Sequence, residues 1–166
     1  MIVDTLRVAL ASDEAGRELQ EAIGTYLGEQ TEVPVEWATV EVDPSDEPDA
    51  PEVALAVAEA IGRGEFDRGI LVCGSGVGMA IAANKVPGIR AAQCHDPYTA
   101  EHARTSNDAQ ILVLGSRAVG QELAKRVVAS FMAARFEETP RRRGKMAKLD
   151  AIERRFLRAP EGPGAV

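Results

Sequence analysis

The chain has 166 residues, of which 45% are hydrophobic and only 4% aromatic, and it carries a net charge of −7. This length suits one domain with a sizeable core of Ala, Val, Ile and Leu side chains. The acidic balance argues against nucleic-acid binding, and the first residues show neither a signal peptide nor a transmembrane span, so we expect a cytoplasmic protein with no nucleic-acid or membrane partner.

Short apolar runs alternate with amphipathic stretches along the chain, a pattern typical of repeated βαβ units. We expect strands at residues 5–11, 35–42, 69–73, 89–94 and 109–114. Helices are expected after Ser12-Asp13 and at residues 51–62, 79–84, 97–106, 120–136 and 149–157, with a proline-rich acidic loop at residues 43–51. The predicted fold class is α/β: a three-layer, Rossmann-like α/β/α sandwich with five parallel strands. It occupies one domain at residues 1–158, followed by a flexible tail at 159–166.

A glycine-rich segment, Cys73-Gly74-Ser75-Gly76-Val77-Gly78, follows the third expected strand. Open α/β sheets bind ligands beyond the carboxyl ends of their strands. Glycines let the backbone approach a ligand and turn its N–H groups toward an anion. The spacing matches neither the dinucleotide fingerprint nor a Walker loop, so a glycine-rich turn that serves packing alone is the competing interpretation.

Two cysteines, Cys73 and Cys94, lie on separate expected strands without the spacing of metal ligands, which indicates free, reduced thiols. Cys73 would lie beside amide donors and a helix N-terminus, which favour its thiolate. The competing interpretation is a small buried hydrophobic residue. Ser75 could carry a proton or only cap the following helix.

Several motifs in order resemble one known family. They are Val72-Cys-Gly-Ser-Gly-Val-Gly-Met79, Ile81-Ala-Ala-Asn-Lys-Val-Pro-Gly-Ile-Arg90, Ser106-Asn-Asp-Ala-Gln110 and Leu114-Gly-Ser-Arg117. Together they are similar to the ribose-5-phosphate isomerase B / galactose-6-phosphate isomerase family over residues 8–153. The resemblance implies the strand order 2-1-3-5-4, and a homodimer with the active site at the subunit interface and a C-terminal helix reaching the neighbour. Further pairing of dimers stays open. Isomerisation through a cis-enediolate needs a base and oxyanion donors but neither a metal nor an organic cofactor.

The resemblance also implies roles for individual residues. Cys73 matches the general base, because the glutamate of another branch is replaced by Met79 here. Ser75 matches a hydroxyl that moves a proton between substrate oxygens. The remaining matches are the anion-hole backbone of Gly74, Gly76, Val77 and Gly78, the sugar-hydroxyl contacts Asp13 and Asn107, and the phosphate ligands Arg117, Arg141 and Lys145. The last two are expected to reach a neighbouring subunit's site.

Two histidines of the family are missing. Glu14 replaces one after Asp13, and Ser106 replaces the one credited with opening a furanose ring. His102 lies about one helical turn earlier and could compensate, although an ordinary surface histidine is the competing interpretation. His95 is a further candidate for the cleft.

Loss of a ring opener fits a substrate without a ring. A four-carbon sugar phosphorylated on O4 cannot close a furanose, so the sequence predicts interconversion of D-erythrulose 4-phosphate and D-erythrose 4-phosphate. Ribose 5-phosphate is the second candidate substrate and galactose 6-phosphate the third. A non-catalytic sugar-phosphate-binding subunit is the alternative from another class, but binding alone would not require Cys73.

Overall fold

The computed structural model describes residues 5–29, 32–40, 42 and 48–156. Its strands are β1 (Leu6–Ser12), β2 (Val35–Ala38), β3 (Arg68–Cys73), β4 (Ala91–Gln93) and β5 (Ile111–Gly115). Its helices are the 3₁₀ turn η1 (Glu14–Gly16), α1 (Arg17–Glu29), α2 (Ala50–Gly62), α3 (Val77–Ala83), α4 (Pro97–Asn107), α5 (Gln121–Ala133) and α6 (Pro140–Phe156). The tail expected at 159–166 lies outside the described residues.

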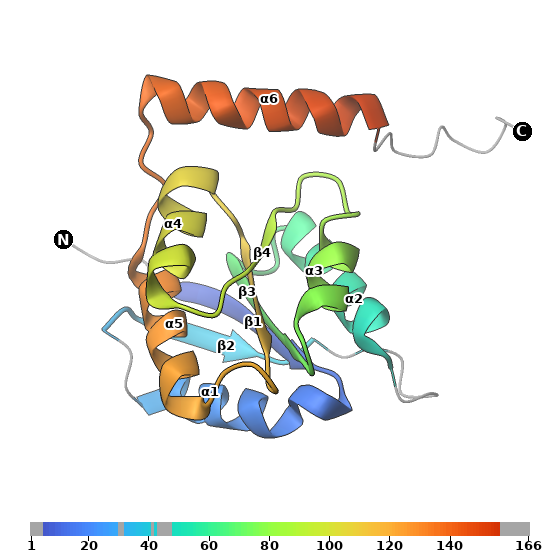
Figure 1. Ribbon diagram of the computed structural model, residues 1–166, viewed down its shortest axis with the longest axis vertical. Coiled ribbons are helices and arrows are strands. Elements are labelled where there is room, and N and C mark those ends of the chain that lie inside the picture. Colours follow the sequence, from blue (N-terminus) through green and yellow to red (C-terminus); the bar gives the residue numbers. More distant parts are fainter. Residues whose placement is uncertain (1–4, 30–31, 41, 43–47, 157–166) are drawn as a thin grey trace, which may run out of the picture.

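The five strands form one parallel sheet in the order β2-β1-β3-β5-β4, which confirms the predicted fold and strand order. Helices α1, α4 and α5 cover one face, and α2 and α3 cover the other (Figure 1). Successive side chains of a strand point to opposite faces. In β3, Ile70 and Val72 therefore pack under the first group of helices, whereas Leu71 and Cys73 pack under the second.

The direction of the chain across the sheet reverses between β1 and β3. From β1 the chain moves one way to β2, and β3 then returns to the other side of β1. Loops that follow such neighbouring strands diverge and leave a crevice at the carboxyl edge of the sheet. Asp13 directly follows β1 and Cys73 ends β3, so the topology brings both residues to this crevice.

Two predicted elements differ most from the structure in their bounds. The strand expected to reach residue 42 ends at Ala38, because Val40 and Val42 pack on the core without joining the ladder. The helix expected to begin at residue 149 begins at Pro140. The Thr139 hydroxyl accepts a hydrogen bond from the Arg142 amide at 3.2 Å, and a proline at the first helical position needs no N–H partner.

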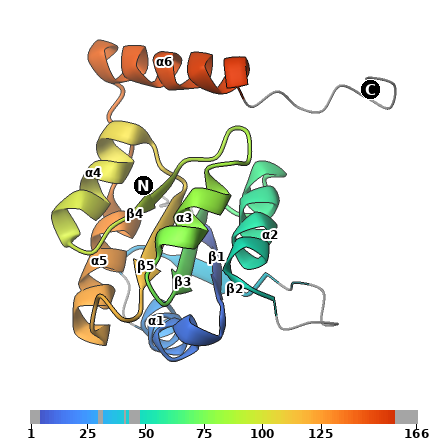
Figure 2. The same ribbon diagram turned by 45° about the vertical axis from the view of Figure 1, so that its right-hand side comes forward.

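Helix α6 stands apart from the sheet and crosses one end of the body, where it packs against the end of α4 (Figures 1 and 2). None of its residues is buried within the described part of the chain. Leu149, Ile152 and Phe156, at helical spacing, are 42%, 56% and 69% exposed. A helix with such an uncovered apolar face gains little stability from its own subunit.

Across the described ranges, no helix combines the length and the apolar character that a membrane span requires.

Candidate active site

A shallow cavity of about 550 Å³ lies at the carboxyl edge of the sheet. It is lined by residues that follow β1, β3 and β5 and by the first residue of α2: Asp13, Ala15, Ala50, Cys73, Gly74, Ser75, Gly78, Arg117 and Ala118. Six of the predicted site residues therefore meet in one place. Parallel strands bring the residues after their carboxyl ends together in this way although those residues are far apart in the sequence.

Cys73 is 4% exposed, and its sulfur accepts a hydrogen bond from the backbone N–H of Gly76 at 3.1 Å. Gly76 adopts φ +82°, a conformation that favours glycine, and this turns its amide back toward the end of β3. The thiol thus faces both the cavity and a backbone donor.

The loop after β3 is held by the loop after β5. The amides of Ser116 and Arg117 donate to the carbonyl oxygens of Cys73 and Gly74 at 2.8 and 3.0 Å. Gly115 permits this approach, because a Cβ there would lie 2.5 Å from the Ser75 carbonyl oxygen. Gln93, which sequence analysis missed, donates through Nε2 to the same oxygen at 2.6 Å. These contacts fix the backbone around Cys73 before any substrate binds.

The polar side chains of this cavity also have local structural roles. The Asp13 carboxylate caps η1 by accepting from the Gly16 amide at 3.0 Å, and Ser75 Oγ accepts from the Val77 amide at 3.3 Å. Both side chains still line the cavity, so capping and substrate contact are compatible. The Val77 side chain is exposed and does not line the cavity, and neither does exposed Glu14.

Four of the other predicted site residues, His102, Ser106, Arg141 and Lys145, line a second cavity of about 430 Å³ between the end of α4 and the start of α6. Its lining consists of His102, Ser106, Glu137, Thr139, Arg141, Arg142 and Lys145. The Lys145 ammonium donates to Ser106 Oγ at 2.7 Å and to Asn107 Oδ1 at 2.5 Å. Arg142 pairs with Glu137, which leaves Arg141 and Lys145 as the excess positive charge of this cavity.

The end of α4 beside this cavity is supported by arginines. Buried Arg104 donates to the Ala109 carbonyl oxygen at 2.6 Å and pairs with Asp108 at 2.9 Å. Burial lowers the pKa of Arg104, and Asp108 opposes that shift. Burial, followed by the charge of Arg104, lowers the pKa of nearby Arg68 to about 10. On the other side, Arg90 binds the carbonyl oxygens of Asn107 and Asp108. The sequence pattern assigned Arg90 no role.

The two cavities lie at opposite edges of the sheet, which α4 connects as it runs from the end of β4 to the start of β5. This helix starts after the carboxyl end of β4 and spans 11 residues, so Asn107 lies about 15 Å along its axis from that edge. The structure therefore groups Asn107 with Lys145 and not with Cys73. One chain does not join the two groups of predicted site residues.

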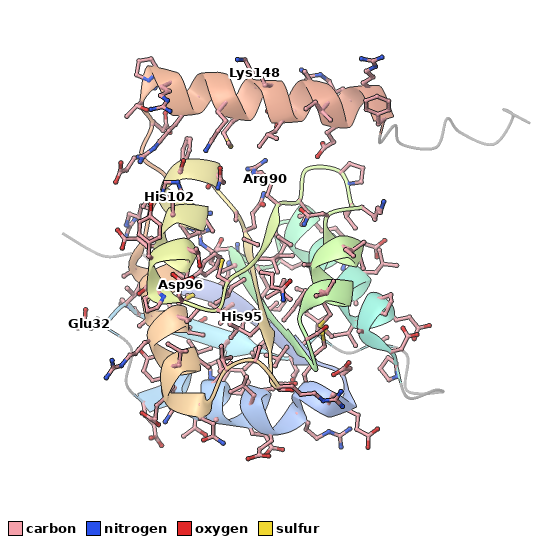
Figure 3. All side chains as sticks on the ribbon, in the orientation of Figure 1. Glu32, Arg90, His95, Asp96, His102 and Lys148 are labelled. Atoms are coloured by element: carbon pink, nitrogen blue, oxygen red, sulfur yellow. The ribbon has the colours of Figure 1, made fainter. Side chains whose placement is uncertain are left out.

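The two histidines differ in their surroundings. His95 lies toward the carboxyl ends of the strands, where its Nε2 accepts a hydrogen bond from the Gly115 amide at 3.1 Å, and it lines neither cavity. His102 is exposed on α4 and stacks on Tyr98, with ring centroids 5.6 Å apart, while also lining the second cavity. Figure 3 shows His102 on α4 and Arg90 beneath α6.

Known proteins resemble this chain over most of its length. The D-erythrulose-4-phosphate isomerase of Pectobacterium atrosepticum is 46% identical over 133 residues, covering 80% of this chain and 86% of that protein. Ribose-5-phosphate isomerase B of Escherichia coli is 40% identical over 149 residues, covering 90% of this chain and 97% of that protein. The type B ribose 5-phosphate isomerase structure from Trypanosoma brucei superposes with a TM-score of 0.83 at 41% identity, covering 90% of this chain and all of that one.

The family model described as Ribose/Galactose Isomerase matches residues 8–149, a span that contains the residues of both cavities and all of the sheet except the first two residues of β1. The chain belongs to the ribose/galactose isomerase family.

Proposed function

We propose that the chain interconverts D-erythrulose 4-phosphate and D-erythrose 4-phosphate through a cis-enediolate, with Cys73 as the general base. The observation that carries this proposal is the environment of Cys73, which lines the carboxyl-edge cavity and whose sulfur already accepts a hydrogen bond from the Gly76 amide. Abstraction of a proton beside a carbonyl needs such a base together with donors for the developing oxyanion.

In the proposed reaction, Cys73 removes a proton from C1 of the ketose and returns it to C2 to form the aldose. Ser75 carries a proton between O1 and O2, while the enediolate charge is stabilised by amides of the Gly74–Gly78 loop other than those of Gly76 and Val77, which already donate to Cys73 and Ser75. Met79 is buried in the same core cluster as Cys73 and offers no carboxylate as an alternative base. Hydrogen bonds from the loop after β5 hold this loop in place, so its amides need little reorganisation during the reaction.

We further propose that a neighbouring copy of the chain supplies the second half of the site. Asn107, Arg141 and Lys145 lie far from Cys73 within one chain, yet their charges and donors suit the phosphate and oxygen atoms of a sugar phosphate. Helix α6 carries these cations and an apolar face that its own subunit leaves exposed. A homodimer in which each α6 reaches the partner's Cys73 cavity would bury that face and complete two equivalent sites.

The tetrose assignment is supported by the absence of a ring-opening histidine. Ser106 occupies the corresponding position, and exposed His102 stacks on Tyr98. A relative named for D-erythrulose 4-phosphate is 46% identical. Ribose 5-phosphate remains the second candidate, because several relatives are named for it.

The test compares D-erythrulose 4-phosphate with D-ribose 5-phosphate, using the wild-type protein and Cys73→Ala. We expect strong tetrose turnover that the variant loses. A higher kcat/KM for ribose 5-phosphate would refute the tetrose assignment. Retained turnover in Cys73→Ala would refute the assignment of Cys73 as the general base. If the wild type turned over neither sugar, a longer sugar or a binding subunit would replace the proposal.

A further inference from the structure

Lys145 lies between two polar side chains of the last turn of α4. Its Nζ is 2.7 Å from Ser106 Oγ and 2.5 Å from Asn107 Oδ1. Ser106 is only 6% exposed, so water competes poorly for its hydroxyl. The ammonium is therefore engaged within its own subunit, whereas the family resemblance made it a phosphate ligand.

The ammonium determines which atoms of both neighbours act as hydrogen-bond acceptors, because it has three donors and no acceptor. Ser106 Oγ and Asn107 Oδ1 must both accept from it. The Ser106 hydroxyl hydrogen and the Asn107 amide N–H₂ then remain as donors, and neither is used by another residue in the described part of the chain. A lysine in this place thus presents two outward donors.

The main chain at this point is fixed separately. Arg90 Nε donates to the Asn107 carbonyl oxygen at 3.0 Å and to that of Asp108 at 3.2 Å, and its Nη2 reaches Asp108 Oδ2 at 3.2 Å. With the backbone held, the orientation of the Asn107 amide depends on its side-chain torsions. Lys145 is the group that selects one of the two amide orientations.

We propose that Lys145 is a positioning residue, which makes Ser106 and Asn107 hydrogen-bond donors toward carbonyl, enediolate or phosphate oxygens of the bound sugar. This inference rests on the proposed function, since it concerns the same shared site. Direct contact with the phosphate then falls to Arg141, which lines the same cavity and forms no ion pair among the described residues. The site would select for an oxygen that accepts, not for one that donates.

The experiment compares Lys145→Met, Lys145→Arg, Asn107→Ala and the Lys145→Met/Asn107→Ala double variant, with Arg141→Ala as the matched control. We expect Lys145→Met to lower kcat by about 10- to 100-fold, the range for hydrogen bonds to a charged group. Its affinity for inorganic phosphate should fall less than that of Arg141→Ala, because Lys145 contributes only its charge to the cavity whereas Arg141 contacts the anion. Lys145→Arg, which keeps N–H donors, should restore most of the turnover.

Two readouts separate this role from the alternatives. In the Asn107→Ala background, Lys145→Met should lower kcat little further, because the amide that Lys145 positions is already absent. Additive losses would overturn the proposal, as would a large loss of phosphate affinity in Lys145→Met with kcat unchanged. Calorimetry with inorganic phosphate and the NMR signals of the Asn107 side-chain amide need no turnover. An inactive wild type whose amide signals still shift in Lys145→Met would refute the proposed function while supporting the positioning role.

Discussion

A shared active site predicts that two inactive variants restore each other. Cys73→Ala disables the carboxyl-edge cavity, and the double variant Asn107→Ala/Arg141→Ala disables the second cavity. Asn107 lies about 15 Å along the axis of α4 from the carboxyl edge of the sheet, where Cys73 lies. In a shared site, the two groups of one chain therefore act on substrates that are bound in two different sites. A mixed dimer would then contain one doubly disabled site and one intact site.

The expected recovery follows from symmetry. Random pairing of equal amounts gives about half mixed dimers, each with one working site of two, and thus about a quarter of wild-type specific activity. The assay unfolds and refolds the two variants together and measures tetrose-phosphate turnover, with native mass spectrometry to quantify the mixed dimers.

A matched control uses two variants of the same cavity, Cys73→Ala and Asp13→Ala, which should show no recovery on mixing. If the first mixture stayed at the level of its parents while mixed dimers were present, the shared-site reasoning would be wrong. Equal recovery in the control would refute it as well, because restoration would then not depend on which cavity each variant disables.

Three other predictions test separate parts of the structure. Burial raises the pKa of the Cys94 thiol, so Cys94 should react with iodoacetamide only at higher pH. At pH 7.5 the reagent should therefore label Cys73 and abolish turnover. Peptide mass mapping that finds Cys94 labelled first would contradict this prediction. Gly115→Ala places a Cβ 2.5 Å from a backbone carbonyl oxygen and should lower the free energy of unfolding, measured in urea, by about 1–3 kcal/mol. The control variant Gly62→Ala places its Cβ in open space and should not lower it. Equal losses of stability in the two variants would contradict the crowding argument. Ile152→Asp on the exposed face of α6 should shift dimer toward monomer in light scattering, and an unchanged mass at low concentration would exclude this face from the interface.

The sheet and the first cavity could be predicted because their signals are local. From Gly69 to Cys73, β3 is a continuous buried apolar run, and the glycines after Cys73 indicate a turn that exposes amides. Parallel topology then brings Asp13 and Arg117 to the same edge without further information. The boundaries were less certain: Val40 and Val42 keep the alternation of a strand although they pack without strand pairing.

The second cavity depends on contacts that no local pattern encodes. The first turns of α6, from Pro140, were not predicted as helix, because they contain Gly144 and a dense basic run and no apolar stripe where the helix meets α4. The contact of Lys145 with Asn107 joins residues 38 positions apart and depends on how α6 crosses the end of α4. Gln93 and Arg90 were missed for the same reason, because each acts on the backbone of a distant loop.

In the proposed shared site, the separation of the two cavities within one chain also bears on how such genes diverge. A chain whose two halves serve different sites can be duplicated, after which one copy can lose its thiol and the other its cationic helix. Neither copy alone would then be useful, but the pair would retain one working site and selection would keep both. Obligate two-gene enzymes can arise from this geometry by loss alone, without the gain of a single new contact.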